Sequence, residues 1–199
     1  MLELDHFFVG VADEFAAVQA LTDFGLNFAP RQIHSGQGTA NRIAWFDNAY
    51  LELLLRNRDR DLQSQPVQTV SLWERMRWQE TGASPFGMAF RFSRNVEQDI
   101  PVETIDYDAP FLPPGISIPV ATPQNSIQEP LIFFSLVAKA PIEQNKIDAS
   151  LLKHKGSQRK LTAIKITTPI SNLSSQLQWF SDRNLISVVR GNKHHAELE

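Results

Sequence analysis

The sequence contains no cysteine, which excludes disulfide bonds, thiolate catalysis and sulfur-ligated metal sites. It also has no apolar run long enough to span a membrane and no strong excess of either charge, with a net charge of −3 over 199 residues. The mild acidity argues against nucleic acid as the main partner, because phosphate binding favours a strongly basic face. The N-terminus, MLELDHFF, lacks the basic segment and long apolar stretch of a signal peptide. We therefore expect a cytoplasmic protein of bacterial type that does not bind membranes.

The first 56 residues have the pattern of a β-α-β-β-β unit. Alternating apolar residues over 2–11 predict a strand. The helix that follows is predicted to begin after the N-cap Asp13 and to stop at Gly25. Three further strands are predicted at 28–33, 41–46 and 50–55.

The rest of the chain repeats this course in weaker form, which is the strongest architectural signal in the sequence. Residues 86–92 predict a strand equivalent to the first, followed by a turn at 95–99 in place of the helix. A third, partial copy has a strand at 161–168, a helix at 171–182 and a strand at 185–189. Between these copies, we predict an exposed connection at 57–68, a helix at 71–80, a proline-rich irregular segment at 100–130 and a strand at 131–137.

The predicted fold class is α+β, with repeated β-α-β-β-β modules that form a cupped mixed sheet and an additional C-terminal β-α-β unit. We predict one compact domain. Its parts are a first module at 1–56, a linker with a helix at 57–85, a degenerate second module at 86–138, a polar connection at 139–160 and a C-terminal partial repeat at 161–199.

Glu52 is the one charged residue in the otherwise apolar stretch 50–55. An ionised and unpaired carboxylate in an apolar wall would cost several kcal/mol. Keeping it protonated at neutral pH would mean raising its pKa by about 3 units, at roughly 4 kcal/mol. We therefore expect Glu52 to have a partner, which could be a cation, a hydrogen-bond donor, a metal ion or water.

Three segments resemble the glyoxalase-like branch of the vicinal oxygen chelate superfamily. They are LDHFFVGV at 4–11, the loop with His34, Gly36, Gly38, Thr39 and Asn41, and AYLELL at 49–54. The resemblance implies paired modules whose sheets curl around a cup that holds a small ligand. In metal-dependent members, a His on the first strand and a Glu on the fourth strand of each module bind one divalent ion. The chemistry of the family includes lyase, isomerase, epimerase and ring-cleaving dioxygenase reactions, while other members only sequester a small molecule.

Carried onto this sequence, the resemblance predicts that His6 and Glu52 lie on one concave face, as catalytic groups or as ligands of Fe, Mn, Ni or Zn. Gly87 and Ile132 stand at the positions of the second His and the second Glu, and neither can bind a metal. His34, His154 or Asp108 could complete the set; alternatively, the ammonium of Lys165 could approach Glu52. The predicted ligand-binding residues are Phe8, His34, Asn41, Tyr50 and Lys165.

Two functions stay open at this point. In the first, the protein is a lyase or isomerase in which Glu52 moves a proton next to a carbonyl and His6 orients it. In the second, it binds or sequesters a small molecule without metal or turnover, and the same pair anchors a polar group. His6 would have neither role if it were a core histidine bonded to Glu52. A homodimer, or assembly through the C-terminal unit, is a further expectation, and His194 and His195 are predicted to lie in a fraying terminus.

Overall fold

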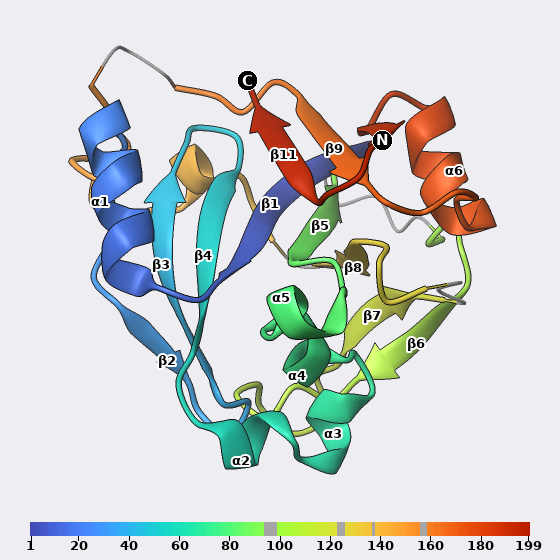
Figure 1. Cartoon of the computed structure of the whole chain (residues 1–199). Helices are drawn as coiled ribbons and strands as arrows, with labels where there is room; N and C mark the ends of the chain where they lie inside the picture. The colour runs from blue at the N-terminus through green and yellow to red at the C-terminus, as the bar shows by residue number, and fades with distance from the viewer. Residues whose placement is uncertain (94–98, 123–125, 137, 156–158) are drawn as a thin grey trace.

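The structure, a computed structural model, describes residues 1–93, 99–122, 126–136, 138–155 and 159–199. Eight strands form one large sheet: β1 (Leu2–Val11), β2 (Gln32–His34), β3 (Thr39–Trp45), β4 (Tyr50–Arg56), β5 (Phe86–Phe92), β6 (Thr104–Tyr107), β7 (Ile118–Ala121) and β8 (Leu131–Phe134). Their order is β2-β3-β4-β1-β5-β8-β7-β6 (Figure 1). The sheet therefore has two halves with the same internal order, which meet where β1 lies against β5.

The pairing within each half is also the same. β1 runs parallel to β4, β5 runs parallel to β8, and β1 and β5 are antiparallel to each other. This arrangement confirms the predicted α+β class with a large mixed sheet. Among the described residues, no helix is both long and apolar enough to cross a membrane.

Helix α1 (Glu14–Phe24) connects β1 to β2 in the first half. The Asp13 side chain accepts a hydrogen bond from the Ala16 amide, and Gly25 ends the helix in the left-handed conformation with φ of 115°. Both signals were predicted, because a carboxylate satisfies the free amides of the first turn and glycine adopts positive φ without strain. The predicted strand at 28–33 is shorter and later, since β2 begins at Gln32.

The second half has no helix between β5 and β6 among its described residues, and most of the predicted turn at 95–99 lies outside them. The C-terminal unit covers this side instead. It consists of β9 (Ile164–Thr168), α6 (Ser175–Asp182), β10 (Ser187–Arg190) and β11 (His195–Leu198). Phe180 of α6 is fully buried and stacks on Phe90 of β5 with ring centroids 4.7 Å apart. The expected fraying terminus is wrong, because His195 begins β11, which pairs with β9.

The linker after β4 differs from its prediction. It holds four one-turn helices: α2 (Asp59–Leu62), α3 (Gln65–Gln68), α4 (Leu72–Arg75) and α5 (Trp78–Thr81). The segment 57–68 is not a simple exposed connection, because Leu62 and Val67 are fully buried. The single helix predicted at 71–80 is interrupted between α4 and α5. Beyond β8, a short 3-10 helix, η1 (Pro141–Glu143), lies in the predicted polar connection.

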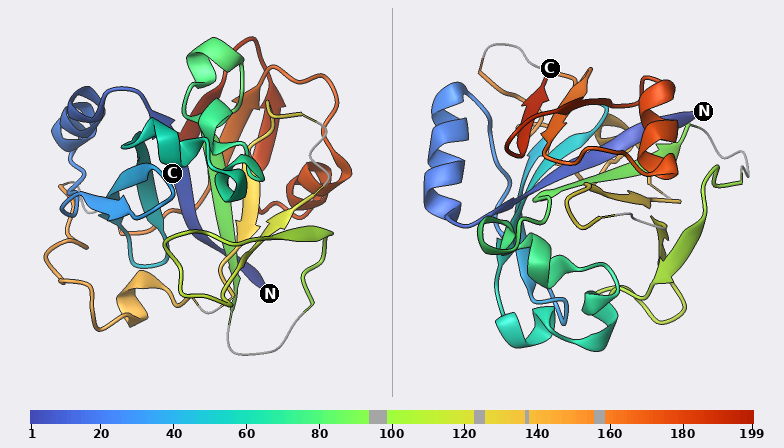
Figure 2. Two further views of the ribbon diagram at one scale, coloured as in Figure 1. Left: turned by 90° about the horizontal axis from the view of Figure 1, so that it is seen from below. Right: turned by 45° about the vertical axis from the view of Figure 1, so that its right-hand side comes forward.

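The two faces of the large sheet are covered by different elements, since successive residues of a strand point to opposite faces. Phe7, Leu53 and Phe90 belong to the core cluster on one face, which also includes residues of helix α1 and of the C-terminal unit. Phe8, Leu54 and Leu131 pack against the linker helices and the start of the β6–β7 loop. The right-hand view of Figure 2 shows the C-terminal unit and helices α2–α5 on opposite sides of β1 and β5. We call the face that carries His6, Phe8, Glu52 and Leu54 the cup.

Candidate functional site

The predicted pair of His6 and Glu52 meets in the cup. The parallel register of β1 and β4 sets His6 beside Tyr50 and Phe8 beside Glu52, as expected from the resemblance. His6 Nε2 lies 3.7 Å from Glu52 Oε2. The two residues are 7% and 6% exposed, so both polar groups lie in a nearly closed environment.

Asp5 holds the ring of His6 in place through the Nδ1 atom. The register between β1 and β5 shifts between Leu4 and His6, which is a β-bulge. Neighbouring side chains on a regular strand point to opposite faces, and the bulge lets the Asp5 carboxylate reach His6 Nδ1 at 2.8 Å. Asp5 in turn accepts a hydrogen bond from Arg91 of β5, at 3.3 Å. His6 Nε2 is thereby directed toward Glu52.

The protonation of Asp5 follows from these contacts. Burial raises the pKa of the Asp5 carboxyl, but the hydrogen bond and charge of His6 and those of Arg91 outweigh it and bring the pKa below its ordinary value. Asp5 is therefore a carboxylate that accepts from both neighbours. Asp5 and Arg91 were not among the residues predicted from the sequence, although Arg91 gives the same signal as Glu52, a lone charge in an apolar strand.

Glu52 has the partner that its position in an apolar strand requires. Asn41 Nδ2 donates a hydrogen bond to Glu52 Oε1 at 2.7 Å and lies 3.2 Å from His34 Nε2. His34 Nε2 is itself 3.8 Å from Glu52 Oε1. The structure therefore brings together four of the predicted site residues, His6, His34, Asn41 and Glu52.

Two oxygen atoms of this cluster have no hydrogen-bond donor. Asn41 Oδ1 is buried without a partner among the described residues, although the residue is only 4% exposed. Glu52 Oε2 makes no hydrogen bond within the described part of the chain, and His6 Nε2 is beyond hydrogen-bond distance at 3.7 Å. Polar groups at this separation are commonly joined by a donor between them, such as water or a group of a ligand.

A chain of hydrogen bonds holds His34 through its Nδ1 atom. Thr39 Oγ1 lies 2.8 Å from His34 Nδ1 and accepts from Gln37 Nε2, and the hydroxyl of Tyr107 donates to Gln37 Oε1. Gly38 adopts a φ of 82°, and an added Cβ would lie 2.5 Å from a backbone oxygen, so glycine is required in this loop. Burial lowers the pKa of His34; the charge of Glu52 opposes this shift and that of His6 adds to it.

Aromatic rings surround the two imidazoles. Tyr50 stacks on His6 with centroids 4.3 Å apart, and the edge of Phe133 meets the same ring at 5.2 Å. Phe111, from the proline-rich loop, stacks on His34 at 4.9 Å. Burial, together with the negative charges of Glu52 and Asp5, raises the pKa of the Tyr50 hydroxyl. The site is thus a small polar cluster inside an aromatic wall.

Among its described residues, the second half of the sheet carries no counterpart of this cluster. A Cβ at Gly87 would lie 2.0 Å from Phe8 Cε1, so the Phe8 ring occupies the space of the second His. The placement of Ile132 needs a correction. The register pairs Gly87 with Leu131 and Ala89 with Phe133, which makes Phe133 the counterpart of Glu52. Ile132 belongs to the core on the opposite face.

Other predicted residues lie away from the cluster. Lys165 is on β9 and pairs with Glu197 at 3.0 Å, so the expectation that it lies in the cup is wrong. His154 Nε2 contacts the backbone oxygen of Trp45, and Asp108 is exposed. Phe8 does lie in the cup, as part of its apolar floor.

The cup residues do not fit a resident divalent metal ion. Asn41 Nδ2, a hydrogen-bond donor, occupies the space between Glu52 and His34 that a bridging cation would take. Gly87 and Phe133 offer no ligand atom from their side chains. Among the residues that the structure describes, no group of three or more His, Cys, Asp or Glu side chains could hold a metal ion. His6 and Glu52 alone are too few donors for a dedicated transition-metal site.

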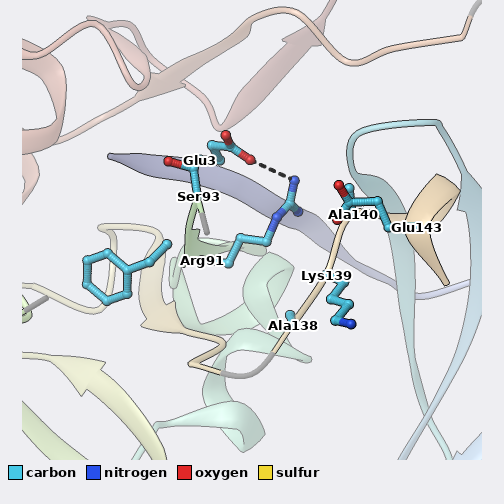
Figure 3. Close-up of a pocket in the computed structure, with 8 residues that line it drawn as sticks. Glu3, Arg91, Ser93, Ala138, Lys139, Ala140 and Glu143 are labelled. Carbon is cyan, nitrogen blue, oxygen red and sulfur yellow. Dashed lines mark hydrogen bonds and ion pairs between the residues drawn. The ribbon is translucent and has the colours of Figure 1, made fainter. Parts of the chain in front are cut away.

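A pocket of about 500 Å³ lies beside the cluster, at the end of the cup face formed by the start of β1 and the end of β5. Figure 3 shows Arg91 within it, linked to Glu3, with Lys139 and Glu143 on the facing segment. Arg91 is only 4% exposed. The same guanidinium contacts Asp5, so this pocket is two side chains away from His6.

Comparison with known proteins agrees with this arrangement. The family model described as a glyoxalase-like domain matches residues 4–104, which include His6, His34, Asn41 and Glu52. A crystal structure described as a hypothetical protein from Staphylococcus aureus is 13% identical, with a TM-score of 0.57 over 98% of this chain and 88% of that chain. A search of curated proteins found no match. The family match confirms the resemblance seen in the sequence, and the structural match confirms the fold.

Proposed function

This chain belongs to the glyoxalase-like family, and we propose that it binds a small organic molecule in the cup with Glu52 as the polar anchor. The observation that carries the proposal is the pair of oxygen atoms without donors, Asn41 Oδ1 and Glu52 Oε2. A buried acceptor without a partner costs about 1–3 kcal/mol. A ligand that supplies the donors recovers this energy on binding.

Binding without turnover is the function we favour. Removal of a proton next to a carbonyl creates a negative oxygen, which an enzyme stabilises with free hydrogen-bond donors or a metal ion. The donor closest to Glu52 is the Asn41 amide, and its two hydrogens already face Glu52 and His34. The cluster therefore offers acceptors where this reaction needs donors.

A lyase or isomerase is the second candidate, and the contact between Asp5 and His6 favours it. A carboxylate that holds an imidazole in one orientation is a common support for acid–base catalysis. In this case Glu52 Oε2 takes the proton from carbon and His6 orients the substrate.

One titration tests both candidates. The ¹⁵N spectrum of the protein is recorded in H₂O with acetophenone and with benzyl alcohol, and exchange of the acetophenone methyl hydrogens is followed by ¹H NMR in a separate sample in D₂O. We expect shifts of the His6, Asn41 and Glu52 amides without exchange. Glu52→Gln should weaken these shifts, and Glu143→Gln, at an exposed carboxylate, should leave them unchanged.

Three outcomes decide against parts of the proposal. Exchange of the acetophenone methyl hydrogens that is lost in Glu52→Gln would show that the protein is an enzyme and would contradict binding without turnover. A stoichiometric metal in protein purified without chelator, lost in Glu52→Gln, would do the same. Shifts confined to residues outside the cup would contradict both candidates.

A further inference from the structure

The two carboxylates of the cluster differ in how the described residues balance their charge. Asp5 is matched by the guanidinium of Arg91. Glu52 has no Lys or Arg partner among the described residues, and its ionic neighbours are the imidazoles of His6 and His34 at 3.7 and 3.8 Å. Burial, the largest influence on the pKa of His34, favours its neutral form. Within the described part of the chain, a positive charge beside Glu52 would therefore come from His6, and otherwise from a bound ligand.

The hydrogen bonds show that the cluster also lacks donors. The Asp5 carboxylate can only accept, so the hydrogen of a neutral His6 ring lies on Nδ1 and leaves Nε2 as an acceptor. Three acceptors of the cluster then lack a hydrogen-bond donor among the described residues: His6 Nε2, Asn41 Oδ1 and Glu52 Oε2. The Asn41 amide cannot serve them, because its donors are in use. What fits between them is a group that carries several N–H donors.

The wall around these acceptors is aromatic. Tyr50 and Phe133 contact His6, Trp45 lies against Tyr50 with centroids 4.7 Å apart, and Phe111 contacts His34. Apolar rings also contact the hydrocarbon part of an organic cation, which a hydrated metal ion lacks.

We infer that the ligand of the cup is a small organic amine, bound in its ammonium form with N–H donors directed at Glu52 Oε2 and Asn41 Oδ1. This inference rests on the proposed function and names the chemical class of its ligand. A bound ammonium compensates the charge of Glu52 and donates hydrogen bonds to acceptors that lack a donor among the described residues.

The test compares benzylammonium, benzyl alcohol and benzoate, which share one ring and differ in the polar head. Dissociation constants are measured at pH 7 from the shifts of the His6, Asn41 and Glu52 amides. We expect benzylammonium to bind at least tenfold more tightly than benzyl alcohol, and benzoate to bind most weakly. Glu52→Gln should reduce the preference to within twofold, and Asn41→Leu should reduce it in part. Glu143→Gln, which removes a charge from the neighbouring pocket, should leave the preference intact.

The outcomes that would contradict the inference distinguish an error in the class of ligand from an absence of small-molecule binding in the cup. Equal affinity for benzyl alcohol and benzylammonium overturns the ammonium inference and leaves the small-molecule site standing. Absence of cup shifts with all three compounds contradicts both. A His6 ring whose two nitrogens stay protonated at pH 8 in the free protein, shown by ¹⁵N chemical shifts, would mean that His6 itself supplies the charge. Tighter binding of Zn²⁺ than of benzylammonium at these amides would also overturn the inference.

Discussion

The two halves of the large sheet share one topology and differ in chemistry. In the first half, β1 and β4 place His6 and Glu52 in the cup, where His34 and Asn41 join them. In the second half, β5 and β8 place Gly87 and Phe133 at the corresponding positions. One half of the cup is therefore a polar cluster, and the other is an apolar wall that packs against it.

The difference teaches that the backbone of a repeat can be retained after its ligand set is lost. The space left at Gly87 is filled by Phe8, and Phe133 packs its edge on His6. The second half also has the C-terminal unit packed on its outer face. The contribution of this contact to stability is the first test of the comparison between the two halves.

Phe180→Ala should have the largest effect on stability. The ring is fully buried and stacks on Phe90, so its removal should cost about 4 kcal/mol in the free energy of unfolding. Urea denaturation measures the loss. Trp179→Ala is the matched control, because this neighbour is only partly buried, and it should cost less than half as much. Equal losses would mean that the C-terminal unit does not support the second half through this contact.

Gly87→Ala tests whether Phe8 excludes a side chain from the second half. The added methyl would overlap the Phe8 ring and should cost about 3 kcal/mol, since the closely packed strands leave little room to move. In a Phe8→Ala background the same substitution should cost almost nothing. A double-mutant cycle by denaturation measures this coupling, and independent, additive effects would contradict the packing described for Gly87.

Asp5→Asn tests whether Asp5 supports His6, and its effect on the free energy of unfolding should depend on pH. The pKa of Asp5 in the folded protein lies below its ordinary value, so the ionised group stabilises the fold above about pH 4. This contribution is lost as the pH falls through the lower folded pKa. We expect Asp5→Asn to cost about 2 kcal/mol at pH 7 and progressively less below about pH 4. Asp182→Asn, at an exposed carboxylate, is the control, and a difference from wild type that stays constant down to pH 2 would contradict the assignment.

Much of the fold could be predicted from local signals. The cap at Asp13 and the stop at Gly25 fix α1, and the alternation of apolar residues fixes β1 and β4. The linker helices could not be predicted in this way, because each is only one turn long. Their position depends on burying Leu62, Val67 and Leu72 against the cup, a tertiary effect that polar neighbours conceal in the sequence.

The candidate site could be predicted where the polarity of a residue differs from that of its sequence neighbours. Glu52 stands out because a carboxylate in an apolar strand needs a partner, and His6 follows from the resemblance. The Ile132 error arose because one residue of register changes the face of the sheet, and no local pattern fixes the register of a distant strand. Lys165 was misplaced because a repeat in sequence need not occupy the equivalent place in the fold.

Tyr107→Phe should have the smallest effect, and it tests the hydrogen-bond chain that joins β6 of the second half to the cluster. The hydroxyl of Tyr107, on β6, donates to Gln37 in the loop that carries His34. Its loss leaves a buried amide oxygen unsatisfied and should cost about 1 kcal/mol, measured by urea denaturation. Gln37→Leu in the same background should cost clearly more, because it also removes the hydrogen bond from Gln37 Nε2 to Thr39 Oγ1. If Tyr107→Phe leaves both the stability and the ¹⁵N shifts of His34 unchanged, this hydrogen-bond chain does not couple β6 to the cluster.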